Sequence, residues 1–216
     1  MRRLIEALNF KFIYLRKAFG NNAFKLLDIG SGNHSATKTC RVFSNCKYYG
    51  LDISKNYNNN ENDFKLMQDF YELDLNLMDF TSVPSNFFDA IMMNHVIEHL
   101  SKGDEVIEKL LSKLKKGGII FIEYPGQKST RLPSMYGTLN FYDDDTHVRI
   151  YSVKELSSLL ERNNFSVIKS GTRRNWYYIF LMPLRIIQSL ITYKKIVGSV
   201  FWDILGFAEF VYARKK

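Results

Sequence analysis

The segment LLDIGSGN at residues 26–33, followed by YYGLDIS at residues 48–54, decides the fold of this 216-residue chain. Two glycines stop the first apolar run, a segment with the composition of a short helix follows, and the second run ends at Asp52. A strand, a glycine turn, a helix and a second strand form a βαβ unit. Such a unit implies parallel strands joined by a right-handed crossover.

The rest of the chain continues the alternation of strands and helices. Hydrophobic periodicity predicts helices over three ranges: 3–19, 105–116 and 153–162. The second of these should stop at Gly117-Gly118, and Ser152 should cap the third. Short apolar runs predict five more strands, at residues 70–74, 87–93, 119–124, 165–170 and 207–213.

Composition indicates a single domain over residues 1–216. The chain is 46% hydrophobic and 24% charged, enough for one α/β core with little left for a second. The two cysteines, Cys40 and Cys46, form no disulfide framework, so we expect a reduced, cytoplasmic setting. The first residues alternate charged and apolar side chains, so we expect no signal peptide.

The net charge of +8 gathers at the two ends of the sequence. Residues 1–20 contain five basic side chains and one acidic one, and residues 171–216 contain eight and two. Nucleic-acid binding over the whole surface would not concentrate charge in this way. A solvated rim or attraction to an anionic lipid or substrate fits better.

Three carboxylates end the first three predicted strands. Asp28 precedes Gly30 and Gly32, which let the backbone approach a ligand. Asp52 is well placed for the hydroxyls of a ribose, and Asp74 could bind an adenine amine. A carboxylate at position 28 favours a cationic ligand over a pyrophosphate. The dinucleotide fingerprint would also need a glycine where this chain has Ser35.

Five segments together resemble the class I S-adenosylmethionine-dependent methyltransferases, in particular their small-molecule methyltransferase group. They are, in order, LLDIGSGN (26–33), YYGLDIS (48–54), ELDL (72–75), FDAIMMNHVIEHL (88–100) and LKKGGIIFIEYPG (114–126). The resemblance continues more loosely over residues 147–168. It implies a Rossmann-like three-layer sandwich with a mostly parallel seven-stranded sheet and an antiparallel last strand. Asn33, where a third glycine is common, tolerates a positive φ.

The resemblance also implies a cofactor, S-adenosylmethionine, with S-adenosylhomocysteine as product. Carried over position by position, it predicts that the methionine part, the ribose, the adenine and the sulfur are contacted by ten residues: Asp28, Gly30, Ser31 and Gly32; Asp52 and Ile53; Asp74 and Leu75; and Asn94 and His95. We expect Glu98 and His99 to brace the segment after the fourth strand.

Four regions are expected within the domain. An N-terminal amphipathic helix (1–20) precedes the cofactor-binding core (23–126), a substrate loop (127–150) and a helical insertion or lid (173–206) before the last strand. Within the insertion, residues 176–193 contain a single charged residue, Arg185, and also Pro183. That length and the proline favour amphipathic pieces over a spanning helix. Such pieces would either cover the core or make a peripheral contact with the inner face of the membrane.

His147 is the candidate catalytic residue. It follows three aspartates at 143–145 in the substrate loop, where it could take a proton from an acceptor hydroxyl. The alternative is an Asp–His contact that pins the loop. The aspartates favour an exposed acidic turn over a cation site, so we predict no metal.

The acceptor is predicted to be a small molecule, possible classes being a sugar or a lipid-linked hydroxyl. The main alternative is a catalytically inactive cofactor-binding or scaffold protein of the same fold. An NAD-dependent dehydrogenase is disfavoured by Asp28 and Ser35. Amino methylation of nucleic acid is disfavoured by the sequence at 94–97, Asn-His-Val-Ile, which lacks the Pro-Pro motif of those relatives.

Overall fold

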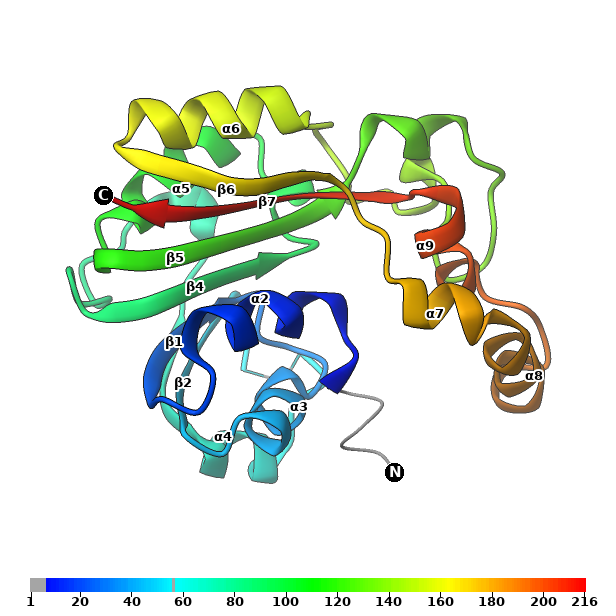
Figure 1. Cartoon of the computed structure of the whole chain (residues 1–216), viewed down its shortest axis with the longest axis horizontal. Helices are drawn as coiled ribbons and strands as arrows, with labels where there is room; N and C mark the ends of the chain where they lie inside the picture. The colour runs from blue at the N-terminus through cyan, green and yellow to red at the C-terminus, as the bar shows by residue number, and fades with distance from the viewer. Residues whose placement is uncertain (1–6, 56) are drawn as a thin grey trace.

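The computed structural model describes residues 7–55 and 57–216, and its centre is a sheet in the order β3-β2-β1-β4-β5-β7-β6 (Figure 1). The strands are β1 (Phe24–Ile29), β2 (Cys46–Asp52), β3 (Met67–Glu72), β4 (Phe88–Asn94), β5 (Leu114–Pro125), β6 (Phe165–Thr172) and β7 (Ala208–Lys215). Strands β1 to β5 pair in parallel, and β7 runs antiparallel to both β5 and β6. The predicted fold, with its antiparallel last strand, is confirmed.

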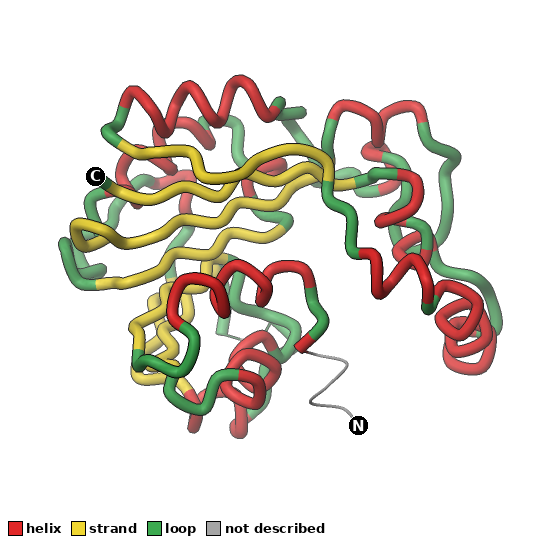
Figure 2. The backbone as a smooth tube through the Cα atoms, viewed as in Figure 1, coloured by secondary structure: helices red, strands yellow, loops and turns green. Residues whose placement is uncertain are grey.

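Helices pack on both faces of the sheet (Figure 2). They are α2 (Phe10–Phe19), α3 (Ser35–Val42), α4 (Glu61–Leu66), α5 (Gly103–Leu111) and α6 (Val153–Arg162). Successive strand residues point to opposite faces, so Leu26 packs with α2 and α3 whereas Leu27 packs with α5 and α6. Both leucines have no exposed surface. The two apolar layers give the three-layer sandwich.

The predicted N-terminal helix is interrupted at Asn9. Ala7 is helical, but Asn9 is extended and its side chain accepts from the N–H of Lys11, so a separate helix, α2, starts at Phe10. Residues 3–6 of the predicted helix lie outside the described residues. The helix packs Phe12 and Leu15 fully into the core.

The helix predicted over 105–116 is shorter, and the reason lies in β5. Helix α5 ends at Leu111, and β5 already begins at Leu114. The pairing of β5 with β4 shifts register between Leu114 and Ile119, and Gly117 has a φ of +76°. The glycine pair therefore forms a bulge within a strand and not a helix stop. Buried Lys113 lies beyond the end of the helix and donates to the carbonyls of Phe80 and Val83.

Other elements differ from prediction only at their ends. The third strand is Met67–Glu72, so Asp74 follows the strand instead of ending it. The sixth extends to Thr172, and the last begins at Ala208 and continues to Lys215. Helix α6 agrees with its predicted range, and Ser152 accepts from the N–H of Glu155 as expected for its cap.

Two segments far apart in sequence form a lobe beyond the carboxyl ends of the parallel strands (Figure 1). One is the 127–150 segment, with the short helices η3 (Gln127–Arg131) and η4 (Phe141–Asp143); the other, between β6 and β7, consists of α7 (Trp176–Phe180), α8 (Met182–Tyr193), η5 (Gly198–Val200) and α9 (Trp202–Leu205). They share an apolar cluster around Leu139 and Phe207. Pro183 lies in the first turn of α8, where a missing N–H costs nothing. No helix among the described residues is both long and apolar enough to cross a bilayer.

Asp143 organises the first segment of the lobe. Its carboxylate accepts from the N–H groups of Met135, Leu139 and Asn140 at 2.8–3.1 Å and from the hydroxyl of Ser134. Burial raises the pKa of this carboxyl, but these donors outweigh burial and lower it to about 2. The first residue of the acidic run is therefore a structural acceptor that folds the segment around itself.

A buried chain of charges ties the lobe to the sheet. The Arg173 guanidinium donates to Glu123 on β5 at 2.8 Å and, through two nitrogens, to both oxygens of Asp203 on α9 at 3.0 and 2.9 Å. All three side chains are at most 9% exposed. Burial alone would raise the pKa of Glu123, but the positive charge of Arg173 lowers this pKa to about 2. The second segment of the lobe is thus fixed at both of its ends, just after β6 and just before β7.

Substituting Arg173→Met should lower the free energy of unfolding by about 3–5 kcal/mol, because two buried carboxylates lose their partner. Urea unfolding followed by circular dichroism at pH 7 measures the loss. The control is Lys115→Met, which removes a partly exposed pair with Asp89 and should cost no more than about 1 kcal/mol. Equal losses in the two variants would contradict the assignment.

Substituting Asp143→Asn should remove about 1–2 kcal/mol of stability at pH 7, because charged acceptors make the stronger hydrogen bonds. The pKa of Asp143 is lowered in the folded state, so its contribution is complete above about pH 5 and disappears as the pH falls through about 2. The stability difference between wild type and variant, from urea unfolding at several pH values, should therefore shrink over that window. Asp145→Asn, at the exposed end of the run, is the control, and a pH-independent difference would contradict the prediction.

Candidate functional site

A glycine turn follows β1 at the carboxyl edge of the sheet. Gly30 has a φ of +72°, and a Cβ there would lie 2.4 Å from a methyl group of Val96. The N–H groups of Gly30 and Ser31 donate to the carbonyl of Leu51 at the end of β2. The turn therefore needs glycine, and it holds the ends of β1 and β2 together.

Asp52 joins the same turn from β2. One carboxylate oxygen accepts from the N–H of Gly32 at 3.0 Å, and the other accepts from the N–H of Ile53 at 2.8 Å. Burial raises the pKa of Asp52, and the backbone N–H donors of Ile53, Gly32 and Ser54 oppose that shift. A carboxylate has about four lone-pair sites, so the group can still accept from a further hydroxyl. The Ile53 side chain is 63% exposed and lies beside it in sequence.

Asp28 has a different environment from the one that a ligand contact needs. Its side chain is 1% exposed, and one oxygen accepts from the hydroxyls of Ser35 at 2.5 Å and Tyr48 at 2.7 Å. These bonds fix the start of α3 and the inner face of β2 beneath the glycine turn. Sequence reasoning missed Tyr48 and treated Ser35 only as a missing glycine. The alternation of β2 does point Tyr48 to the face that α3 covers.

Asp74 begins the short helix η1 (Leu75–Leu77). Its Oδ1 accepts from the backbone and side-chain N–H groups of Asn76 at 2.9 and 3.1 Å. Leu75 is 8% exposed. The pair follows β3 at the same edge of the sheet as Asp52, with the N–H of Leu73 bonded to the carbonyl of Asp52.

Two polar side chains near the glycine turn lack partners. Asn94 ends β4, and both of its amide atoms are buried without a hydrogen-bond partner among the described residues. The hydroxyl of Ser31 is in the same condition. Buried polar groups are normally satisfied, and leaving one unpaired costs about 1–3 kcal/mol. Unpaired groups at adjacent strand ends are what a site that awaits a polar ligand would contain.

His95, next along the chain, lies in the buried charge chain. Its φ is 53°, its Nδ1 is 3.3 Å from Glu98, and its Nε2 is 3.3 Å from Glu123. Burial lowers the pKa of His95, but the two carboxylates outweigh burial and raise it to about 9. The ring lies 4.9 Å from that of Trp202 in the lobe. His95 is therefore an imidazolium at neutral pH and links β4 to the lobe.

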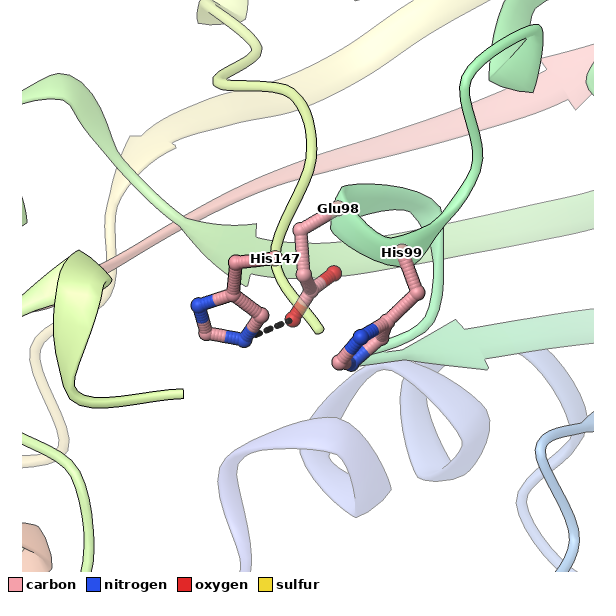
Figure 3. A group of neighbouring side chains, drawn as sticks. All are labelled: Glu98, His99 and His147. Carbon is pink, nitrogen blue, oxygen red and sulfur yellow. Dashed lines mark ion pairs between the residues drawn. The ribbon is translucent and has the colours of Figure 1, made fainter. Parts of the chain in front are cut away.

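His147 has a buried side chain that contacts its own segment. Its side chain is 4% exposed, its Nδ1 lies 2.6 Å from the carbonyl of Phe141, and its Nε2 lies 4.0 Å from a carboxylate oxygen of Glu98. His99 is beside it, with ring centroids 4.8 Å apart (Figure 3). The structure therefore brings together His147, which the sequence singled out, and Glu98 and His99, which it assigned to bracing.

The other predicted site residues follow β1, β2, β3 and β4, all at one edge of the sheet. His147 is separate from the glycine turn and is grouped instead with the segment after β4. The three aspartates at 143–145 have different environments, because the Asp143 carboxylate accepts hydrogen bonds from backbone N–H groups within the lobe. Its neighbour Asp144 has one oxygen 3.8 Å from Nε2 of His147.

Comparison with known proteins gives both a family and a set of related folds. A family model described as "Methyltransferase domain" matches residues 2–170. No curated protein matches the sequence.

Three solved structures illustrate the similarity of fold. A SAM-dependent methyltransferase from Archaeoglobus fulgidus is 22% identical, with a TM-score of 0.62 over 100% of this chain and 95% of that one. A methyltransferase from Mesorhizobium loti is 13% identical, with a TM-score of 0.61 over 95% and 97%. Phosphoethanolamine N-methyltransferase 2 from Haemonchus contortus, solved with phosphomonomethylethanolamine and S-adenosylhomocysteine, is 21% identical, with a TM-score of 0.66 over 94% and 51%.

Proposed function

The chain belongs to the methyltransferase domain family and is an S-adenosylmethionine-dependent methyltransferase, and from that premise we propose that it methylates a small acceptor presented at a membrane surface. The acceptor that the lobe favours is apolar or lipid-linked and carries the reacting hydroxyl, for instance on a sugar.

The observation that carries the cofactor proposal is the unpaired pair, Ser31 and Asn94. Their side-chain polar atoms are buried and without partners among the described residues, Ser31 within the turn that Gly30 opens and Asn94 at the end of the neighbouring strand β4. A ligand with hydrogen-bonding groups would satisfy both. The residues of this edge therefore fit the amino-acid end of S-adenosylmethionine, which offers an ammonium and a carboxylate.

The remaining roles follow the strand ends. Asp28, Gly30, Ser31 and Gly32 would surround the methionine part. Asp52, with Ile53 beside it, would accept from the ribose hydroxyls. Asp74 and the N–H of Leu75 would bind the adenine, and Asn94 and His95 would lie near the sulfur. For Asp28 the support is electrostatic, since its buried carboxylate adds negative charge beneath the turn while its hydrogen bonds go to Ser35 and Tyr48.

Negative charge at this edge also argues against a dinucleotide. Asp28 lies beneath the turn where a pyrophosphate would have to bind, and like charges there would repel. Asp52 suits the ribose of either cofactor and does not discriminate between them. A dinucleotide site would have its third glycine at position 35, and a glycine there could not donate the hydrogen bond that the Ser35 hydroxyl makes to Asp28.

The chemistry asks little of the protein beyond position. The sulfonium of the cofactor supplies a methyl group that is already activated. The residues of the site then have to hold acceptor and donor in line and exclude water, which can contribute about 7–11 kcal/mol in well-oriented reactions. The lobe, which lies beyond the strand ends, is the part of the chain positioned to enclose an acceptor.

The surface of α7 and α8 supports a membrane-bound acceptor. It exposes seven large apolar or aromatic side chains, each at least 53% accessible: Trp176, Tyr177, Phe180, Leu184, Ile187, Ile191 and Tyr193. Exposed Lys194 and Lys195 follow at the end of α8. Apolar side chains bordered by lysines fit an anionic lipid surface better than a second copy of this basic chain. The place of action would then be the inner face of the membrane.

Substituting Asp52→Ala should weaken binding of S-adenosylhomocysteine by about 10- to 100-fold, because hydrogen bonds to a charged acceptor contribute about 1.5–3 kcal/mol. Isothermal titration calorimetry measures the change. Asp69→Ala, an exposed carboxylate on β3 away from the strand end, should bind as wild type does. If wild type bound NAD and not S-adenosylhomocysteine, the cofactor assignment would be wrong. If it bound the cofactor but formed no S-adenosylhomocysteine with sugar, quinone or lipid-linked acceptors, the scaffold alternative would hold.

Phe180→Ser combined with Ile191→Ser should abolish sedimentation with vesicles of phosphatidylglycerol and phosphatidylcholine, which wild type should show at low salt and lose at high salt. Ile168→Ser, at an exposed apolar residue on β6, is the control and should sediment normally. No sedimentation of wild type at low salt, or dimerisation through the same residues in analytical ultracentrifugation, would exclude the membrane.

A further inference from the structure

Three side chains outside the cofactor edge converge from two segments (Figure 3). Glu98 and His99 lie on η2 (Ile97–His99), just after β4, and His147 comes from the segment before α6. One ligand atom of each lies within 4.8 Å of the others. The two segments are joined by the N–H groups of Val148 and Arg149, which donate to the carbonyl of Glu98 at 2.8 and 3.2 Å.

Hydrogen bonds orient both imidazoles in the same way. Nδ1 of His147 lies 2.6 Å from the carbonyl of Phe141, and Nδ1 of His99 lies 3.2 Å from the carbonyl of Thr146. The hydroxyl of Thr146 donates to Asp144, so it too can only accept from His99. A carbonyl cannot donate, so each Nδ1 must carry the proton. In both neutral rings the lone pair is therefore on Nε2, as in histidines that bind metals.

Glu98 provides an independent indication of a cation site. Its side chain is 1% exposed, and neither carboxylate oxygen has a hydrogen-bond partner within the described part of the chain. The His95 imidazolium lies 3.3 Å away and offsets part of the charge, but it is shared with Glu123 at the same distance. A buried carboxylate that makes no hydrogen bond and shares its cation is costly, and a coordinated metal ion would compensate for it.

We propose that Glu98, His99 and His147 bind one divalent transition-metal ion. Two imidazoles and one carboxylate are a donor set that suits zinc and neighbouring metals, and it leaves coordination positions open. Asp144, whose carboxylate lies 3.8 Å from Nε2 of His147, is the nearest further oxygen donor. Ligand atoms on one ion lie about 3–4 Å apart when each bond is about 2.1 Å, so small side-chain rotations complete the site.

The role of the ion rests on the proposed function. The cluster follows β4 directly, and Asn94 at the end of that strand is assigned to the cofactor. An ion here would act as a Lewis acid toward an oxygen of the acceptor, so it favours acceptors that present a hydroxyl or another oxygen donor.

The first experiment measures metal binding alone. Purified protein treated with a chelator is titrated with Co²⁺, followed by visible absorption, and with Zn²⁺, followed by calorimetry. Wild type should bind one ion, and His147→Ala, His99→Ala and Glu98→Gln should each weaken binding at least tenfold. His34→Ala is the matched control, because His34 pairs with Asp63 elsewhere and should leave binding unchanged. No binding, or binding that none of the three substitutions weakens, would overturn the proposal. Should His147→Ala not fold, the more exposed His99→Ala decides.

The second experiment separates this proposal from the methyltransferase assignment. Calorimetry with S-adenosylhomocysteine on the metal-free protein should show cofactor binding whether or not the ion is present. Cofactor binding without metal binding would refute only the metal site. Metal binding without cofactor binding would refute the proposed cofactor site and leave the metal site standing. Loss of turnover in His147→Ala with Co²⁺ binding retained would make His147 a proton acceptor and not a ligand.

Discussion

The contact on which the lobe depends is the buried chain of charges from Glu123 through Arg173 to Asp203. It begins on β5, within the sheet, and ends on α9, which lies in the lobe outside the sheet. Removing three charged groups from water costs free energy. Hydrogen bonds from three nitrogens of Arg173 to the two carboxylates offset that cost. An apolar contact of the same size would bury the segment equally well but would not fix its direction.

The same chain connects the lobe to the residues nearest the proposed cofactor. Glu123 faces His95, whose ring contacts Trp202 of α9 on one side and Glu98 on another. The end of β4 is therefore held between the sheet and the lobe by charge and ring packing together. A shift of α9 would therefore move His95, so the lobe and the end of β4 are mechanically coupled.

The fold could be predicted because its determinants are local. The spacing of Gly30, Gly32 and Asp52 requires a strand, a turn and a second parallel strand, whatever the rest of the chain does. Predictions were wrong where a residue type has two uses. Gly117 and Gly118 can stop a helix or make a bulge, and only the pairing of β5 with β4 decides between them. Asn9 is one polar residue in an apolar helical pattern, yet it is the N-cap of α2 and so interrupts the predicted helix.

The candidate site divides in the same manner. Residues that follow strands in a parallel sheet must meet at one edge, so sequence order alone was enough to collect Asp52, Asp74 and Asn94 there. The cluster of Glu98, His99 and His147 depends on a segment that returns 47 residues later along the chain, held by backbone bonds to Glu98. No periodicity encodes such a return. The sequence shows the three residue types, whereas only the fold shows that the Glu98 carboxylate is buried without a hydrogen bond among the described residues.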